Sequence, residues 1–189
     1  TSSAVSFVAS AFTTVRMAHE DAPALSVISK MLRSLYIHRE VREKGGAYGG
    51  FALYNSEDGV FSLASYRDPH IAATLNVFDG AFDFARTGRF GETDIKEAIL
   101  QVCAEIDKPD PPGPAARKAF FRKVIGLSDE TRERFKQRLI GLTRGEVAAA
   151  AERYFGGGLS QCSVAVIGSE EKLREANAKL TESLELFKI

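Results

Sequence analysis

The residues of this sequence most suited to chemistry are an arginine and a tyrosine that border a glycine-rich run. Arg42 precedes Tyr48 by six positions, and the segment 45–50 (GGAYGG) contains four glycines. A guanidinium and a phenol can both donate hydrogen bonds to a carbonyl oxygen that gains negative charge. Because the flanking glycines have no side chain, another chain could approach the Tyr48 hydroxyl closely. The pair therefore suits peptide recognition and oxyanion stabilisation, although it supplies no nucleophile.

The glycine run has two other interpretations. In a purely structural one, Gly45 and Gly46 end a helix, and the later glycines give the next strand room for its backbone. In the other, Lys44 and the glycines bind a phosphate or another small molecule. Anion sites favour helix N-termini, whereas this helix runs into the glycines at its C-terminus, so the phosphate interpretation is disfavoured.

The histidines and cysteines, whose side chains could bind a metal ion or react, form no catalytic motif. His19, His38 and His70 make no zinc-binding pair on one helical turn, and each is interpreted as a surface or capping residue. Two cysteines are too few for a disulfide framework. Cys103 lies in a helical pattern and Cys162 in a strand pattern, so both are predicted to be small core residues. Their sparse use favours a reducing compartment, either the cytoplasm or an organelle matrix.

Composition narrows the class of protein. The chain has 189 residues, which suits one domain, and we predict that this domain spans residues 1–189. Its 25 basic residues balance its 25 acidic residues, so no basic field points to nucleic acid or to an anionic membrane. No apolar run reaches the length of a membrane span. We therefore expect neither nucleic acid nor a membrane as a partner.

Hydrophobic periodicity predicts the elements that position Arg42 and Tyr48. A helix that opens near Asp21 and Pro23 should run to about Glu43, just before the glycines. The predicted strands are 4–15, 48–54, 60–66 and a buried strand at 163–167. Two further helices should begin at Asp68-Pro69 and directly after Thr93, which would cap the second one. A proline-rich loop should follow at 107–114. The remaining helices are predicted over 115–125, 128–141, 143–155 and 170–180.

The order of these elements predicts the fold class. The strands 48–54 and 60–66 are joined by a turn-forming loop and should pair as a hairpin. The strands are unevenly separated, and a regular alternation of strand and helix is absent. This favours an α+β two-layer sandwich, a mixed or antiparallel sheet with helices packed on one face.

The run 38–50 (HREVREKGGAYGG) resembles the C-terminal, non-zinc half of the pitrilysin/insulinase family of zinc metallopeptidases, with the presequence-protease subfamily the nearest match. The match continues through 65–69 (SYRDP), and 5–8 (VSFV) and the helix at Pro23 also fit. It is strong over residues 4–86 and weaker toward the C-terminus.

The resemblance implies a clamshell protease in which two halves, built from repeated α+β units, enclose short unfolded peptides. The half that this chain lacks would hold the zinc ion and a glutamate base. It further implies that Tyr48 binds the peptide carbonyl and the tetrahedral intermediate, and that Arg42 positions the peptide backbone, with Gly49 beside them in the substrate-binding site. No zinc ligand is carried over to this chain, so we expect the chain alone to be inactive and to bind no cofactor itself.

Two expectations follow about the larger assembly. The chain begins without Met inside a predicted strand, which suggests a fragment of a longer protein. The resemblance implies that this fragment is the later part of a C-terminal-half unit. Its partner would be the N-terminal catalytic half, in cis or in trans. The alternative function is a non-catalytic scaffold or assembly subunit with the same fold. The presence of both Arg42 and Tyr48 argues against that alternative, because a scaffold does not need them.

Overall fold

A four-stranded antiparallel sheet lies at the centre of the protein, with the strand order β2-β3-β1-β4. The structure is a computed structural model, and it describes residues 5–188. The strands are β1 (Ser6–Thr13), β2 (Gly49–Asn55), β3 (Val60–Asp68) and β4 (Ser163–Ile167). The predicted hairpin is confirmed as β2 and β3. The predicted first strand began at Ala4, which lies outside the described residues.

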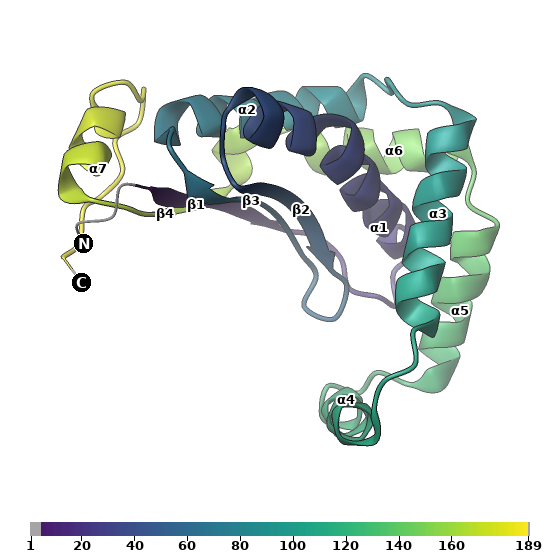
Figure 1. The fold of residues 1–189 in the computed structure, drawn as a ribbon. Coiled ribbons are helices and arrows are strands. Elements are labelled where there is room, and N and C mark those ends of the chain that lie inside the picture. The colour runs from purple at the N-terminus through teal and green to yellow at the C-terminus, as the bar shows by residue number, and fades with distance from the viewer. Residues whose placement is uncertain (1–4, 189) are drawn as a thin grey trace.

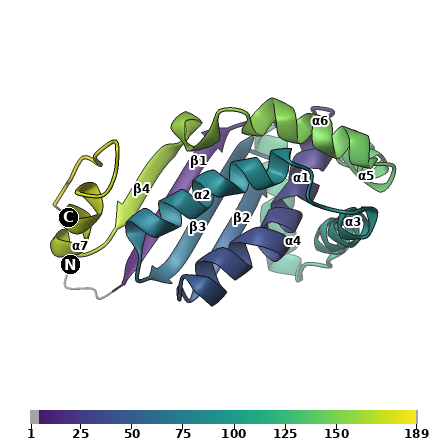
Figure 2. The same cartoon turned by 90° about the horizontal axis from the view of Figure 1, so that it is seen from above.

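Helices cover one face of this sheet (Figure 1). Those packed on or above the strands are α1 (Ala22–Met31), the π-helix η1 (Leu32–Lys44), α2 (Ile71–Arg86) and α6 (Arg144–Phe155). The others are α3 (Glu92–Asp107), α4 (Pro112–Val124), α5 (Asp129–Ile140), the short 3-10 helix η2 (Gly158–Gln161) and α7 (Glu170–Asn177). Figure 2, the view from above, shows α2 lying over the strands of the sheet. The predicted α+β two-layer fold is confirmed.

Alternation along β1 and β3 builds the core. Every second residue of β1 is buried from Ser6 to Phe12, because successive side chains of a strand point to opposite faces. On the sheet, the Phe12 ring lies 5.4 Å from Phe82 of α2 and 5.4 Å from Phe155 of α6, measured between ring centroids. The Phe61 ring lies 5.0 Å from Phe155. These aromatic contacts join the two layers.

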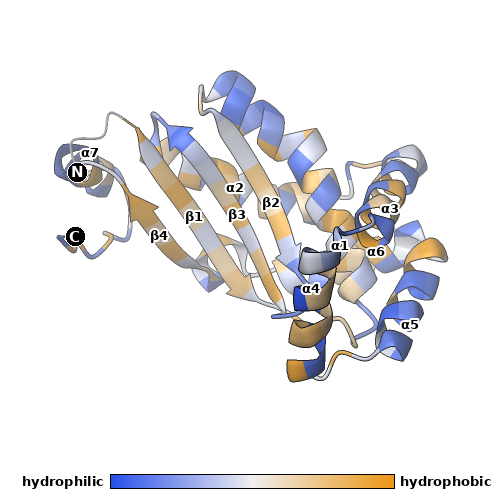
Figure 3. Cartoon of the chain, turned by 60° about the horizontal axis from the view of Figure 1, so that its bottom comes forward, coloured by the Kyte–Doolittle hydropathy of each residue, from blue (hydrophilic) through white to orange (hydrophobic). Residues whose placement is uncertain are grey.

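Within residues 5–188, no helix is packed across the opposite face of the sheet (Figure 3). This face presents Phe7 of β1, Leu53 of β2, Tyr66 of β3 and Ile167 of β4, of which Leu53, Tyr66 and Ile167 are exposed. The strand 163–167, predicted to be buried, is therefore a half-exposed edge strand. The prediction was wrong because a continuous apolar run does not reveal that only one side of a strand meets the core.

The predicted helix between Pro23 and Glu43 forms, but its second half is wound differently from an α-helix. From Leu32 to Lys44 it is a π-helix, whose hydrogen bonds join residues five apart. The amide of Gly45 continues this pattern by donating to the Glu40 carbonyl at 3.1 Å. Gly46 then takes a left-handed conformation with φ of 73°, which favours glycine and ends the helix as predicted.

Several predicted boundaries differ from the structure, and three of them concern the start of a helix. Helix α2 begins at Ile71 rather than at Asp68-Pro69, although the Asp68 carboxylate does accept the amide of His70 at 2.8 Å. Helix α3 begins after Gly91, whose amide donates to Asp94, so Thr93 is not its cap. The proline-rich loop is shorter than predicted, because Pro112 starts α4. Proline is tolerated in the first helical turn, where an amide would lack a partner in any case.

The two cysteines are less buried than predicted. Cys103 in α3 and Cys162 just before β4 are both half-buried and free, and both pack against the edge of the core. Burial raises the pKa of the Cys162 thiol to about 11. That thiol therefore behaves as a small packing residue rather than as a nucleophile.

Candidate functional site

Arg42 and Tyr48 both lie on the surface, near the junction between the end of η1 and the start of β2. Both side chains are exposed, and Tyr48 is 70% exposed. The turn between them is closed by the Gly46 amide, which donates to the Arg42 carbonyl at 3.0 Å, and by the Ala47 amide, which donates to the Val41 carbonyl at 3.2 Å. The chain therefore folds back onto the last turn of η1 before Tyr48 emerges.

The strand β3 holds Tyr48 in place. The Tyr48 amide donates to the Arg67 carbonyl at 3.4 Å. The Tyr48 ring meets the Tyr66 ring at 5.9 Å and 66°, and Tyr66 in turn meets Phe7 at 5.3 Å and 73°. Sequence reasoning did not identify Tyr66 as part of this arrangement. The sequence offered only an indirect signal for Tyr66. In the predicted hairpin, Tyr66 pairs with Gly49, the residue that follows Tyr48.

The guanidinium of Arg42 is held by an imidazole. Its Nη1 donates to His38 Nε2 at 2.9 Å, and His38 Nδ1 lies 3.3 Å from Glu43 Oε1. The other two cations near this end of η1 share a carboxylate instead. Arg39 and Lys44 each donate to Glu40 Oε1 at 2.9 Å. The hydrogen bond from Lys44 is the main reason why the pKa of Glu40 is lowered.

The glycines of the run serve the packing of η1 on β2. A Cβ on Gly50 would lie 2.8 Å from Ile37 Cγ2 and 3.0 Å from Val41 Cβ, both of which are buried. A Cβ on Gly49 would lie 3.1 Å from the Phe51 ring. The structural interpretation of the glycines thus accounts for Gly46, Gly49 and Gly50. It does not account for the exposed guanidinium of Arg42 or for the hydroxyl of Tyr48, whose ring alone packs on Tyr66.

The chemistry open to this site is donation to an oxygen. A phenol hydroxyl and a guanidinium, both accessible, can hydrogen-bond a carbonyl and stabilise the charge that develops on it. Across residues 5–188 no group of three or more His, Cys, Asp or Glu side chains could hold a metal ion. The site therefore contains neither a nucleophile nor a metal centre of its own.

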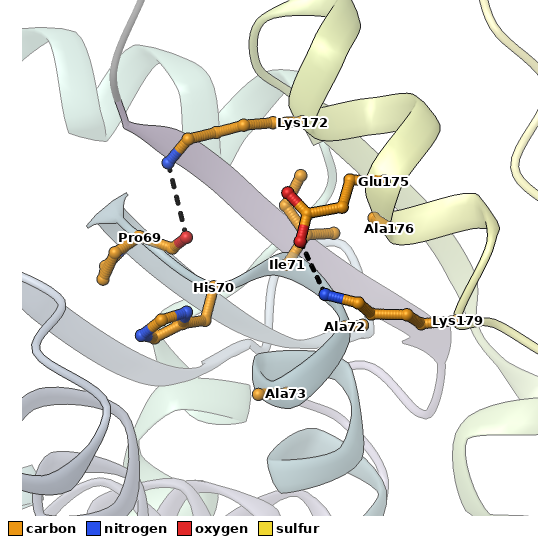
Figure 4. A pocket seen from close by; sticks show the side chains of 9 residues that line it. All are labelled: Pro69, His70, Ile71, Ala72, Ala73, Lys172, Glu175, Ala176 and Lys179. Carbon is orange, nitrogen blue, oxygen red and sulfur yellow. Dashed lines mark hydrogen bonds and ion pairs between the residues drawn. The ribbon is translucent and has the colours of Figure 1, made fainter.

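A separate hollow lies where α2 and α7 meet (Figure 4). It measures about 160 Å³, and its charged groups already have partners. Lys172 Nζ donates to the Pro69 carbonyl at 3.3 Å, and Lys179 Nζ donates to Glu175 Oε1 at 2.6 Å. Arg42 and Tyr48 do not line it, so this hollow is not the substrate site that the sequence predicts.

Residues 2–153 match the family model for the PreP C-terminal domain. The chain belongs to this family. It is 38% identical over 168 residues to the mitochondrial presequence protease of Danio rerio, an alignment that covers 89% of the chain but 16% of that protein. The chain thus spans about a sixth of this relative. The family resemblance inferred from the segment 38–50 is confirmed.

Solved structures place this PreP C-terminal domain among pitrilysin-like peptidase folds. A putative zinc protease from Bordetella pertussis Tohama I superposes with a TM-score of 0.72 at 13% identity, covering 87% of this chain and 93% of that one. Pitrilysin superposes with a TM-score of 0.60 at 16% identity, covering 87% of this chain and 18% of that one. At such low identity these likenesses establish the fold alone.

No helix in the described part of the chain is long and apolar enough to cross a membrane.

The three histidines were interpreted as surface or capping residues. His19 and His70 are exposed. His38 is 44% exposed, and its ring is also bonded to Arg42, a contact that the interpretation did not include. The sequence signal for this contact was the spacing of four residues between His38 and Arg42 within one predicted helix.

Proposed function

We propose that this chain is the substrate-binding part of the C-terminal half of a zinc metalloendopeptidase that degrades short unfolded peptides. The single observation that carries the proposal is the exposure of Tyr48 on a family-matched PreP C-terminal domain, anchored by Tyr66 yet free at its hydroxyl end. The Tyr48 hydroxyl would donate to the carbonyl oxygen of the scissile peptide bond and to the tetrahedral intermediate.

Arg42 would bind the peptide backbone beside Tyr48. Its guanidinium is paired with an imidazole rather than with a carboxylate, so its charge remains available to a carbonyl oxygen. Gly49 would border the same site, because it follows Tyr48 directly and is half-buried beside Phe51. In this arrangement the chain binds and orients the peptide and carries out no bond cleavage by itself.

The rest of the reaction belongs to a partner. The described residues offer no zinc site, so zinc would be held by an N-terminal catalytic half, joined in cis or acting in trans. The chain, as one domain over residues 1–189, would form the later part of one unit of the C-terminal half. The relative from Danio rerio is mitochondrial, and an organelle matrix is the location we propose here as well.

The test is turnover by the complete enzyme after Tyr48→Phe. Losing one oxyanion donor should lower kcat by roughly ten- to a thousand-fold. The matched control is Tyr36→Phe, which removes a hydroxyl from η1 while leaving its ring packed on Phe84 at 5.1 Å, and it should turn over as wild type. Wild-type turnover by Tyr48→Phe would overturn the proposal. An assembly that cleaves no peptide at all would favour the scaffold alternative.

A further inference from the structure

The π-helical winding of η1 brings Glu43 within reach of His38, which an α-helix would also place beside Arg42 but not beside a residue five positions on. His38 lies four residues before Arg42 and five before Glu43, and it contacts both, at 2.9 and 3.3 Å. In an α-helix, residues three and four apart are neighbours on the surface. In a π-helix the hydrogen bonds run between residues five apart, so residue i+5 also lies one turn above residue i. A single imidazole can therefore bridge Arg42 and Glu43.

The chemistry of the partners assigns the proton on this imidazole. Arg42 has only donors, so Nε2 of His38 must accept, which requires that nitrogen to be unprotonated. Glu43 is an acceptor when ionised, so the proton belongs on Nδ1, facing its carboxylate. A doubly protonated ring would set an N–H against the guanidinium. The ring of His38 is thus oriented with Nδ1 toward Glu43 and Nε2 toward Arg42.

We propose that His38 is the positioning residue for Arg42. Building on the substrate-binding role proposed for Arg42, it fixes the guanidinium where the peptide backbone is bound. A free arginine side chain samples many rotamers, and restricting it before the substrate arrives reduces the entropy lost on binding. Because the partner is an imidazole rather than a carboxylate, the restriction does not neutralise the charge of Arg42. Arg39 and Lys44, which share the carboxylate of Glu40, lack this arrangement.

The experiment is a double-mutant cycle in the complete enzyme, measured as kcat/KM on an unstructured peptide. His38→Ala should lower kcat/KM by about three- to ten-fold, mainly through KM, the scale expected for coupling between contacting polar side chains. In an Arg42→Ala background the same change should have no further effect, because nothing remains to be positioned. His70→Ala, the same substitution at an exposed histidine that lines the separate hollow between α2 and α7, should leave kcat/KM unchanged.

Two further variants separate positioning from a loss of folding. In His38→Gln the amide oxygen can take the place of Nε2 and accept from Arg42, so most of the activity should return. In His38→Asn the shorter amide occupies the place of Nδ1, keeps the contact with Glu43 and cannot reach Arg42, so activity should stay low. Equal urea midpoints for both variants would show that they fold alike.

The outcomes are distinguishable. Wild-type kcat/KM for His38→Ala alongside a loss for Arg42→Ala would overturn the role of His38 and leave the proposed function intact. Equal losses from His38→Ala with and without Arg42 would show that the imidazole acts independently, which also overturns it. If Arg42→Ala itself has no effect, the substrate-binding role of Arg42 fails, and the positioning role fails with it.

Discussion

The ring of Tyr48 stands edge-on to the ring of Tyr66, with centroids 5.9 Å apart and an interplanar angle of 66°. Tyr66 is itself edge-on to Phe7 at 5.3 Å, so three rings from three segments form a row. Tyr48 precedes β2 and has one backbone hydrogen bond to β3 and little burial. The row of rings is therefore what limits the directions in which its hydroxyl can point.

Removing the middle ring should loosen Tyr48 without touching its hydroxyl. In the complete enzyme, Tyr66→Ala should lower kcat/KM by roughly two- to ten-fold, since an edge-to-face aromatic pair contributes about 0.5–1.5 kcal/mol. Tyr66→Phe retains the ring and should retain most of the activity. Steady-state kinetics on one peptide compares the two variants. Equal losses in both would mean that the Tyr66 hydroxyl, rather than the ring, matters.

Gly50 should tolerate no side chain. Gly50→Ala forces a Cβ within 2.8 Å of Ile37 Cγ2 and 3.0 Å of Val41 Cβ, and both neighbours are buried between η1 and β2. We expect the free energy of unfolding to fall by about 1–3 kcal/mol, the usual cost of overpacking. Urea denaturation of the chain measures it. Gly145→Ala in α6 is the matched control, because its Cβ would meet nothing nearer than 4.0 Å, and it should be neutral or stabilising.

The N-terminus of α6 should depend on its capping box. Thr143 Oγ1 accepts the Glu146 amide at 3.3 Å, and Glu146 Oε2 accepts from the Thr143 amide at 2.8 Å. Thr143→Ala should therefore cost about 1 kcal/mol of unfolding free energy at pH 7. An unchanged urea midpoint would contradict this.

The same cap should make part of the stability depend on pH. Hydrogen bonds from Thr143 lower the pKa of Glu146 below its ordinary value of 4.5. A lowered pKa means that the carboxylate stabilises the fold above the unfolded value, and that this contribution is lost as the pH falls through the folded value. The difference in stability between wild type and Glu146→Gln should thus shrink between pH 6 and pH 3. A difference that stays constant over this range would argue against the cap as its source.

Cys162 should be a poor nucleophile in the folded chain. Burial is the main cause that raises its pKa to about 11, and the thiolate is the reactive form. In a Cys103→Ser variant at pH 8, alkylation of Cys162 should be on the order of a hundred-fold slower in the folded than in the urea-unfolded chain. Equal rates would show that the thiol is freely ionised.

The raised pKa of Cys162 also has a consequence for stability. As the pH rises, the unfolded thiol ionises first, near its ordinary value of 9.0, while the folded thiol stays neutral toward about 11. Stability should therefore decline over this interval. Cys162→Ser, which does not ionise there, should decline less when the two chains are compared by urea denaturation.

Local chemistry determined much of this protein from its sequence. The spacing of Arg42 and Tyr48 around the glycines identified the candidate site, and alternation identified the hairpin that contains β2 and β3. The helix predicted over 143–155 begins at a capping box between Thr143 and Glu146, which are only three residues apart. Interactions of this range are readable because the backbone geometry between such residues is nearly constant.

Tertiary packing decided the rest. The sequence pattern did not show that the chain from Leu32 is wound as a π-helix. This helix packs against β2, and its winding places Glu43 within reach of His38. The contact between Tyr48 and Tyr66 depends on strand register, which joins residues far apart in sequence. The sequence thus determined which side chains could do chemistry, and only the folded chain decided which neighbours hold them, because those neighbours are set by long-range contacts.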